Sequence, residues 1–281
     1  MSRSGEGRTF RQVDVFTDEP MLGNPVAVVH DAEGLSDEQM QAFARWTNLS
    51  ETTFLLAPTD PGADYRLRIF TPSEELPFAG HPTLGSAHAW RESGGVAAGE
   101  HIVQECGVGL VRLRSEGGRL AFAAPDLIRS GPVEEERIAS TVEALGITRA
   151  AVLDAAWCDN GPGWIGMRLA SADEVLALRP DFTALRERIG VVGPHPPGAR
   201  AAVEVRAFLP HDTGITEDPV TGSLNAGLAQ WLAGDVLPAS YVAAQGTVLA
   251  RRGRVHVETA DDGTIWVGGD TLTTIHGTVL L

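Results

Sequence analysis

The sequence reads Arg68-Ile69-Phe70-Thr71-Pro72 and then His81-Pro82-Thr83-Leu84-Gly85-Ser86, and the same pattern returns later in the chain. The second copy reads Arg206-Ala207-Phe208-Leu209-Pro210 and then Asp218-Pro219-Val220-Thr221-Gly222-Ser223. In both copies a strand and a turn lead to a helix whose first turn carries Pro, Gly and Ser, with a titratable residue just ahead of it. An internal repeat of this kind predicts two related halves and decides the fold.

The two repeated helix starts are the candidate binding sites. The first N–H groups of a helix have no partner within the helix and carry a partial positive charge, so they hold carboxylates. Gly85 and Gly222 permit close backbone approach, and Ser223 offers a hydroxyl donor. If a pseudo-twofold axis relates the helices, they point at one cleft where His81 and Asp218 face each other. Both residues could instead be ordinary N-caps, but their matched positions favour a functional role.

Glu51 is the candidate base. It lies between an expected helix end at Asn48 and an apolar strand. If Phe54 and Leu55 wall its carboxylate, burial raises its pKa toward neutrality, where a general base is efficient. The residues alone favour a plainer alternative, a solvated glutamate at the start of a strand.

Composition and charge exclude several partners and cofactors. With 281 residues, 43% of them apolar, the chain is long enough for two well-packed domains. Its formal net charge of -15 opposes binding to nucleic acid and to anionic membrane surfaces. All 22 basic residues are arginines, so no lysine is present to bind pyridoxal phosphate or to complete a P-loop. We expect no metal, nucleotide or pyridoxal cofactor.

The chain carries no targeting signal that we can identify. Residues 1–11 lack an apolar core, and no stretch approaches the roughly 20 apolar residues of a membrane span. Cys106 and Cys158 form no CxxC pair, which is typical of a reducing compartment. We therefore expect a cytoplasmic protein that does not bind membranes.

Periodicity predicts the elements of the first half. Strands are expected at Arg11–Phe16, Pro25–His30, Glu51–Ala57, Tyr65–Phe70, His101–Gln104, Leu110–Leu113 and Leu120–Ala123. A Ser36/Gln39 capping box opens a helix that ends near Asn48, and a second helix has Pro82 in its first position and stops at Gly94-Gly95. The segment Ala124–Val133 is the candidate boundary. We predict domains at 1–125, completed by about 270–281, and at 126–269.

The second half is expected to alternate in the same way. Helices are predicted at Glu134–Leu145, Ser171–Leu178 and Ser223–Leu232, and strands at Ala150–Trp157, Trp164–Leu169, Ala202–Leu209 and three times between Thr247 and Leu281. The stretch Pro180–Gly198 has no clear pattern.

Other motifs carry less weight. Gly161-Pro162-Gly163-Trp164-Ile165-Gly166 matches GxGxxG, but its proline and the strand that follows argue against a dinucleotide site. The histidines form no HExxH or Cys–His cluster. Neither cysteine belongs to the repeated unit, so both are expected to be packing residues.

The chain resembles the phenazine biosynthesis PhzF-like family, within the diaminopimelate epimerase-like fold. The resemblance rests on motifs spread along nearly the whole chain. They are Val13-Asp14-Val15-Phe16-Thr17, Gly23-Asn24-Pro25-Val26-Ala27-Val28, Ser50-Glu51-Thr52-Thr53-Phe54, Phe70-Thr71-Pro72, Glu75-Leu76-Pro77-Phe78-Ala79-Gly80-His81-Pro82-Thr83, Glu217-Asp218-Pro219-Val220-Thr221-Gly222-Ser223, Gln245-Gly246 and Val267-Gly268-Gly269.

The resemblance implies an α/β fold of the α+β type. Two pseudo-symmetric domains each wrap a curled, mostly antiparallel sheet around a central helix, the active site lies between them, and a homodimer is the usual assembly. It also implies site residues: Glu51, His81, Asp218 and Ser223 as catalytic, and Asn24, Gly80, Thr221 and Gly222 as substrate-binding.

The function implied is that of a cofactor-independent isomerase of a small carboxylate-bearing substrate. Glu51 takes a proton from one carbon and returns it to another, while the helix-start amides and Ser223 bind a carboxylate or a developing enolate. An epimerase or racemase of a small acid and a non-catalytic ligand-binding relative remain open alternatives. Diaminopimelate epimerases and proline racemases use a cysteine pair at the two helix starts, which this chain lacks.

Overall fold

The structure is a computed structural model that describes residues 7–210 and 216–281. It contains two compact units, Met1–Ala123 with Gly269–Leu281 and Ala124–Gly268. Strands predominate in both units, and a few helices accompany them, as the α+β fold class predicts. The boundaries expected from the sequence, 1–125 with 270–281 and 126–269, remain a proposal about which segments fold as domains.

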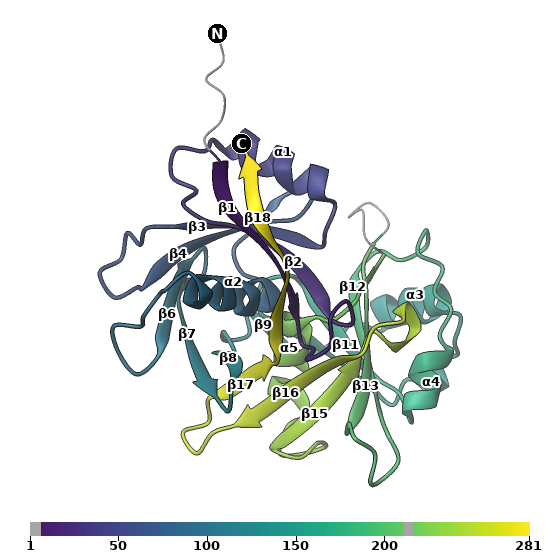
Figure 1. Cartoon of the computed structure of the whole chain (residues 1–281). Coiled ribbons are helices and arrows are strands. Elements are labelled where there is room, and N and C mark those ends of the chain that lie inside the picture. Colours follow the sequence, from purple (N-terminus) through teal and green to yellow (C-terminus); the bar gives the residue numbers. More distant parts are fainter. Residues whose placement is uncertain (1–6, 211–215) are drawn as a thin grey trace. The chain divides into compact units, whose positions relative to one another are not determined.

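The first unit is one sheet curled around helix α2 (Gly80–Glu92). The sheet contains β1 (Gly7–Val15), β2 (Asn24–Val29), β3 (Glu51–Leu56), β4 (Tyr65–Phe70), β5 (Glu75–Leu76), β6 (Ile102–Cys106), β7 (Gly109–Glu116), β8 (Arg119–Ala123) and β18 (Thr271–Leu280). Its pairings run β18–β1–β2–β3–β4–β6–β7–β8, and only β2–β3 and β4–β6 among them are parallel. Because α2 contacts strands at both ends of this order, β18 and β8, the sheet must bend around it (Figure 1).

The composition of α2 explains its central position. Residues 80–87 are all buried, and a helix that is buried on every side belongs inside a core rather than on a surface. Gly85 permits the close approach, because a Cβ there would come within 2.3 Å of Val26 Cγ1. The close approach predicted for Gly85 therefore serves helix packing against β2.

Helix α1 (Asp37–Thr47) confirms the predicted capping box. Ser36 accepts a hydrogen bond from the backbone N–H of Gln39, and the Gln39 side chain accepts one from the backbone N–H of Ser36. Its apolar side buries Met40 and Phe43. The helix ends at Asn48 in the left-handed conformation, which turns the chain into β3, where Glu51 is the first residue.

The second unit repeats this arrangement around helix α5 (Gly222–Leu232). Its strands are β9 (Arg129–Pro132), β10 (Asp154–Asp159), β11 (Trp164–Arg168), β12 (Arg188–Pro194), β13 (Val203–Phe208), β14 (Glu217–Asp218), β15 (Ser240–Gln245), β16 (Gly253–Thr259) and β17 (Ile265–Gly269). The pairings run β9–β10–β11–β12–β13–β15–β16–β17, with β11–β12 and β13–β15 parallel. Strand for strand, this is the order of the first unit.

Four smaller elements among the described residues complete the second unit. Helices α3 (Glu135–Leu145) and α4 (Ala172–Ala177) contribute to a core with β10 to β13, and two short 3-10 turns lie at Arg149–Ala151 and Thr247–Leu249. The strand expected at Ala150–Trp157 is wrong at its start, because residues 149–151 form a 3-10 turn. Strands β12 and β15 had not been expected from the sequence.

The repeat is confirmed, but the helix register expected from it is wrong. Helix α2 begins at Gly80 and α5 at Gly222, each five residues after a glutamate on a short strand (75 to 80, 217 to 222). His81 therefore corresponds to Ser223, and Asp218 lies on β14 ahead of its helix.

The cause of this error is the longer connection in the second copy. Glu75 pairs with Phe70 and Glu217 with Phe208, and these long-range pairings set where each helix can start. Pro82 is the third helical residue and not the first, which is tolerated because the N–H groups of the whole first turn lack helical partners.

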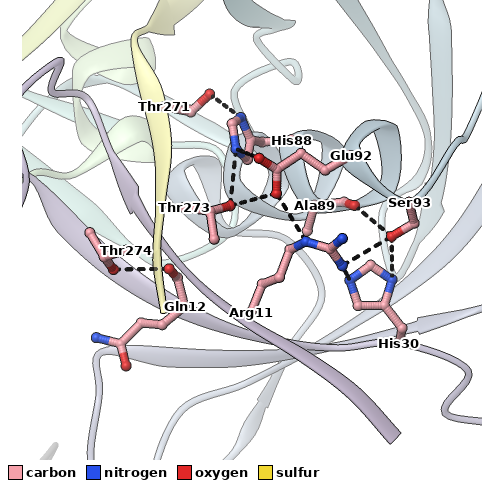
Figure 2. Close-up of polar contacts among 10 residues, drawn as sticks. All are labelled: Arg11, Gln12, His30, His88, Ala89, Glu92, Ser93, Thr271, Thr273 and Thr274. Carbon is pink, nitrogen blue, oxygen red and sulfur yellow. Dashed lines mark hydrogen bonds and ion pairs between the residues drawn. The ribbon is translucent and has the colours of Figure 1, made fainter. Parts of the chain in front are cut away.

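A polar network ties the C-terminal strand β18 to α2 and β1 (Figure 2). Glu92 on α2 accepts hydrogen bonds from Arg11 Nε (2.9 Å) and Thr273 Oγ1 (2.6 Å). His88 on α2 contacts Thr271 on β18, with Nδ1 and Oγ1 2.9 Å apart. These contacts hold β1 and β18 against α2 and place the last strand within the first unit.

His30 also belongs to this network, and its contact with Arg11 determines its tautomer. Arg11 NH1 lies 2.9 Å from His30 Nε2, and because a guanidinium only donates, Nε2 must accept. His30 Nδ1 then carries the proton and faces Ser93 Oγ at 3.2 Å. Burial, followed by the positive charge of Arg11, lowers the pKa of His30 to about 4.

This geometry predicts a loss of stability as the pH falls from about 6.5 toward 4. The unfolded chain binds a proton at His30 throughout that window and the folded chain does not, so lower pH favours unfolding, by at most about 3 kcal/mol from this group. Urea titrations from pH 7.5 to 4 should show a shallower pH dependence in His30→Asn than in the wild type. His276→Asn, a change at an exposed position of β18, is the control and should keep the wild-type slope.

Candidate functional site

The first group of site residues lies in the first unit and centres on His81. Its ring is 3% exposed and lies in the first turn of α2. His81 Nε2 is 3.3 Å from Glu51 Oε2, and the Glu51 side chain is 14% exposed. On the other side of the ring, His81 Nδ1 is 3.2 Å from Asn24 Nδ2. The structure therefore brings together Glu51, His81 and Asn24, from β3, α2 and β2.

His81 is neutral in this arrangement. Burial lowers its pKa to about 3, and a hydrogen bond with the backbone of Pro25 opposes this only in part. A neutral ring places no positive charge beside Glu51 and can exchange a hydrogen bond with the carboxylate. Glu51 is thus a half-buried carboxylate with a polar but uncharged neighbour. The solvated glutamate considered from the sequence is wrong.

The second group lies in the second unit, where α5 begins. Asp218 Oδ2 accepts a hydrogen bond of 2.6 Å from Thr221 Oγ1. Thr221 is the N-cap of α5, and its backbone N–H donates to Gln245 Oε1 at 3.0 Å. Gln245 is 1% exposed and had not been singled out as a site residue; its Gln-Gly motif in the family pattern was the available signal.

Ser223 corresponds to His81 and is likewise buried in the first turn of its helix. Its Oγ accepts a hydrogen bond of 3.1 Å from Trp164 Nε1, and Asn160 Nδ2 donates to its carbonyl at 2.9 Å. Because Trp164 only donates, the hydroxyl proton of Ser223 is directed elsewhere. Trp164 lies in the glycine-rich stretch that does not fit a dinucleotide site, and sequence reasoning assigned it no role here.

The starts of α2 and α5 share a further property. Neither N-cap, Ala79 or Thr221, accepts a side-chain hydrogen bond from its own helix, whereas Ser36 and Ser171 cap α1 and α4 in that way. The backbone N–H groups that follow Gly80 and Gly222 are therefore not satisfied by a local cap. Such groups suit an anionic ligand.

The two units repeat the backbone but not the chemistry. Glu51 pairs with Val26 at the start of β3, and the corresponding pair at the start of β12 is Arg188 with Trp164. The second unit thus has a cation where the first has the candidate base. The meeting of Glu51, His81, Asp218 and Ser223 that the sequence predicted stays a prediction.

Cysteine chemistry does not fit either helix start. Cys106 lies on β6 and Cys158 on β10, and both are free. Burial raises the pKa of Cys158 to about 12 and also raises that of Cys106, so neither is poised as a thiolate. Among residues 7–210 and 216–281, no group of three His, Cys, Asp or Glu side chains could hold a metal ion. In the same residues, no helix is long and apolar enough to span a membrane.

Comparison with known proteins identifies relatives along the whole chain. The family model described as phenazine biosynthesis-like protein, PhzC-PhzF, matches residues 13–277. Antisense-enhancing sequence 1 of Schizosaccharomyces pombe is 38% identical, and the match covers 96% of this chain and 97% of that protein. Trans-2,3-dihydro-3-hydroxyanthranilate isomerase of Pseudomonas aeruginosa is also 38% identical, over 79% of this chain and 78% of its own.

Solved structures agree with this match. A PhzF family protein of Enterococcus faecalis superposes with a TM-score of 0.79 at 26% identity, covering 98% of this chain and 100% of its own. A hydroxyproline epimerase from Agrobacterium vitis shares the fold at a TM-score of 0.58 and 15% identity, covering 98% of this chain and 93% of its own. The resemblance and the epimerase-like fold stated from the sequence are confirmed.

Proposed function

The chain belongs to the PhzC-PhzF family of phenazine biosynthesis-like proteins and is an isomerase, and from this premise we propose that Glu51 moves a proton between two carbons of a small carboxylate-bearing substrate. The observation that carries the proposal is the 3.3 Å contact between Glu51 Oε2 and His81 Nε2 in the interior of the first unit. Because His81 is neutral, Glu51 can take up and release a proton without breaking an ion pair with this neighbour.

The proposed reaction moves one proton and one electron pair, and it involves only the substrate and the Glu51 side chain. The Glu51 carboxylate removes a proton from an activated carbon, and the electrons of the broken C–H bond move into the conjugated system of the substrate. The protonated Glu51 then delivers that proton to a different carbon of the same system. No oxidant, reductant or second substrate is needed, so we propose that the reaction is cofactor-independent.

His81 and Asn24 position the carboxylate in this proposal. Asn24 is fully buried on β2 and faces one ring nitrogen of His81, which limits rotation of the ring. The other ring nitrogen stays directed at Glu51. His81 thereby keeps a polar but uncharged group 3.3 Å from the Glu51 carboxylate.

The helix starts are the proposed binding groups for the substrate. Ser223 has a proton to donate, and the amides that follow Gly80 and Gly222 suit a carboxylate or the enolate that develops on proton removal. Thr221 and Asp218 complete the second group. We propose that both groups take part in the same turnover. Substitutions in either unit should then reduce the same rate.

The name of one relative suggests which substrate to test first. Trans-2,3-dihydro-3-hydroxyanthranilate is the compound in the name of the Pseudomonas aeruginosa isomerase. It bears a carboxylate and a partly unsaturated ring, the features that the proposed chemistry needs. An epimerase reaction on a small acid is the alternative, and it is distinguished by inversion at one carbon without a shift of a double bond.

Turnover in D₂O tests whether one shielded carboxyl carries the proton. We expect part of the product to retain protium at the new C–H bond, because the same Glu51 proton returns before it exchanges with solvent. Mass spectrometry of the product, with the position of the label read by NMR, makes the measurement. Product deuterated completely at that carbon would contradict a single shielded shuttle and would favour two bases open to solvent.

We also propose that the protein is a cytoplasmic homodimer, as the family resemblance implies. The net charge of -15 supports a protein that does not attach to anionic membranes or nucleic acid. Light scattering of the purified full chain measures the mass, which should be twice 29.8 kDa. A mass of a single chain at micromolar concentration would contradict the dimer.

A further inference from the structure

Gln245 occupies the end of β15, next to the turn that leads into α5. Gln245 pairs with Val205 on β13 and with Gly253 on β16, so both neighbouring strands hold its backbone. The chain then turns at Gly246, where φ is +90° and a Cβ would come within 2.6 Å of the Pro219 carbonyl oxygen. The end of β15 is thus packed closely against the segment that contains Asp218.

The side-chain amide of Gln245 uses its whole hydrogen-bonding capacity. Oε1 accepts from the backbone N–H of Thr221 and from Asn225 Nδ2, both at 3.0 Å. Nε2 donates to the carbonyl of Asp218 at 3.1 Å and to Thr221 Oγ1 at 2.9 Å. A backbone N–H can only donate and a carbonyl can only accept, so these two contacts exclude the flipped amide.

This fixed orientation gives the network a direction. Thr221 Oγ1 accepts a hydrogen bond from Gln245 Nε2, and its own single proton then points to Asp218 Oδ2, 2.6 Å away. A hydrogen bond donated to a carboxyl oxygen stabilises the ionised form more than the protonated form, so this contact favours the Asp218 carboxylate. Gln245 Nε2 occupies one of the two lone pairs of Thr221 Oγ1, and the hydroxyl keeps its proton for Asp218.

We propose that Gln245 is a positioning residue that holds Asp218 in its ionised form through the hydroxyl of Thr221. Gln245 acts through Thr221 and does not itself belong to the groups proposed to contact the substrate. Only its expected effect on turnover rests on the proposed function. The hydrogen bonds directed at Asp218 favour its anion in the reaction, so a substrate with a positively charged or hydrogen-donating group opposite its carboxylate is favoured.

The test replaces the two donors of Gln245 and follows the protonation of Asp218. Gln245→Glu keeps the acceptors for Thr221 and Asn225 but loses both N–H donors. Gln245→Met keeps the length without any polar atom. Gln230→Glu is the matched control, because it makes the same change on α5 at a glutamine that donates to the Pro125 carbonyl outside this network.

NMR of the full chain labelled with ¹³C-aspartate measures the effect, with the Asp218 signal assigned from Asp218→Asn. We expect the protonation midpoint of Asp218 to rise by roughly one pH unit or more in both Gln245 variants and to stay unchanged in Gln230→Glu. The acidic limb of the pH profile of kcat/KM should move in the same direction. A merely structural glutamine would lower thermal stability without moving this midpoint.

The outcomes separate this inference from the proposed function. An unchanged midpoint in Gln245→Met, or an equal shift in Gln230→Glu, would overturn the positioning role. If Gln245→Glu does not fold, Gln245→Met decides alone. If the wild type turns over no isomerase substrate, the NMR titration still tests Gln245, whereas the proposed reaction would have failed.

Discussion

Replacing Glu51 by Gln is expected to lower kcat/KM by roughly 10²- to 10⁴-fold or more while the protein stays folded. The amide keeps the size of the side chain and its position beside His81 Nε2, which lies 3.3 Å from the present carboxylate oxygen. It cannot take up a proton at neutral pH. The substitution therefore removes the proposed proton carrier and leaves the packing around α2 in place.

The measurement is the conversion of trans-2,3-dihydro-3-hydroxyanthranilate, with ligand affinity followed separately by calorimetry. Affinity should change little, because the proposed binding groups are the helix-start amides and Ser223. Glu116→Gln is the control for the chemical change, since Glu116 is an exposed glutamate of the same unit. An active Glu51→Gln enzyme would transfer the role of base to another group, and Asp218 would be the first to examine.

The second large effect concerns stability, and the internal repeat provides its control. Arg206 and Glu217 form a bidentate pair with both contacts at 2.8 Å, and their side chains are only 4% and 8% exposed. Arg206 NH1 also donates to the carbonyls of Val175 and Leu178. Glu217→Gln leaves a buried guanidinium without its anion, and we expect it to lower the free energy of unfolding by about 3–5 kcal/mol.

The same substitution in the first copy should have a much smaller effect. Arg68 and Glu75 form the corresponding bidentate pair, but their side chains are 23% and 41% exposed, and Arg68 also pairs with Asp37. Water and Asp37 compensate the charge, so Glu75→Gln should cost less than about 1 kcal/mol. Urea unfolding of the two variants, followed by circular dichroism, tests the difference. Equal losses would show that burial does not control the strength of these pairs.

Several local features followed from the sequence, because they depend on local order along the chain. Ser36 and Gln39 are three residues apart, and a capping box needs only that spacing. The helix starts at Gly80 and Gly222 lie within motifs that the repeat makes visible. The family resemblance added Glu51, which local chemistry alone did not favour. These features depend on contacts within one element or on patterns that occur twice.

The register of the two halves was decided only by the tertiary structure. The sequence aligned His81 with Asp218 through the proline that follows each, whereas the strand pairs Phe70 with Glu75 and Phe208 with Glu217 align His81 with Ser223. A strand pairing joins residues across a loop of any length, so loop length alone does not reveal it. The longer loop before β14 is what moved the alignment.

The partners of the site residues were decided in the same way. Gln245 reaches Thr221 and Asp218 because β15 lies parallel to β13, and Trp164 reaches Ser223 because β11 passes beside α5. These residues are 24 and 59 positions from Thr221 and Ser223. Local sequence therefore determined which chemical groups the chain carries at its helix starts. The packing of distant strands determined their hydrogen-bond partners, and thereby that His81 is neutral and that Asp218 accepts a hydrogen bond from Thr221.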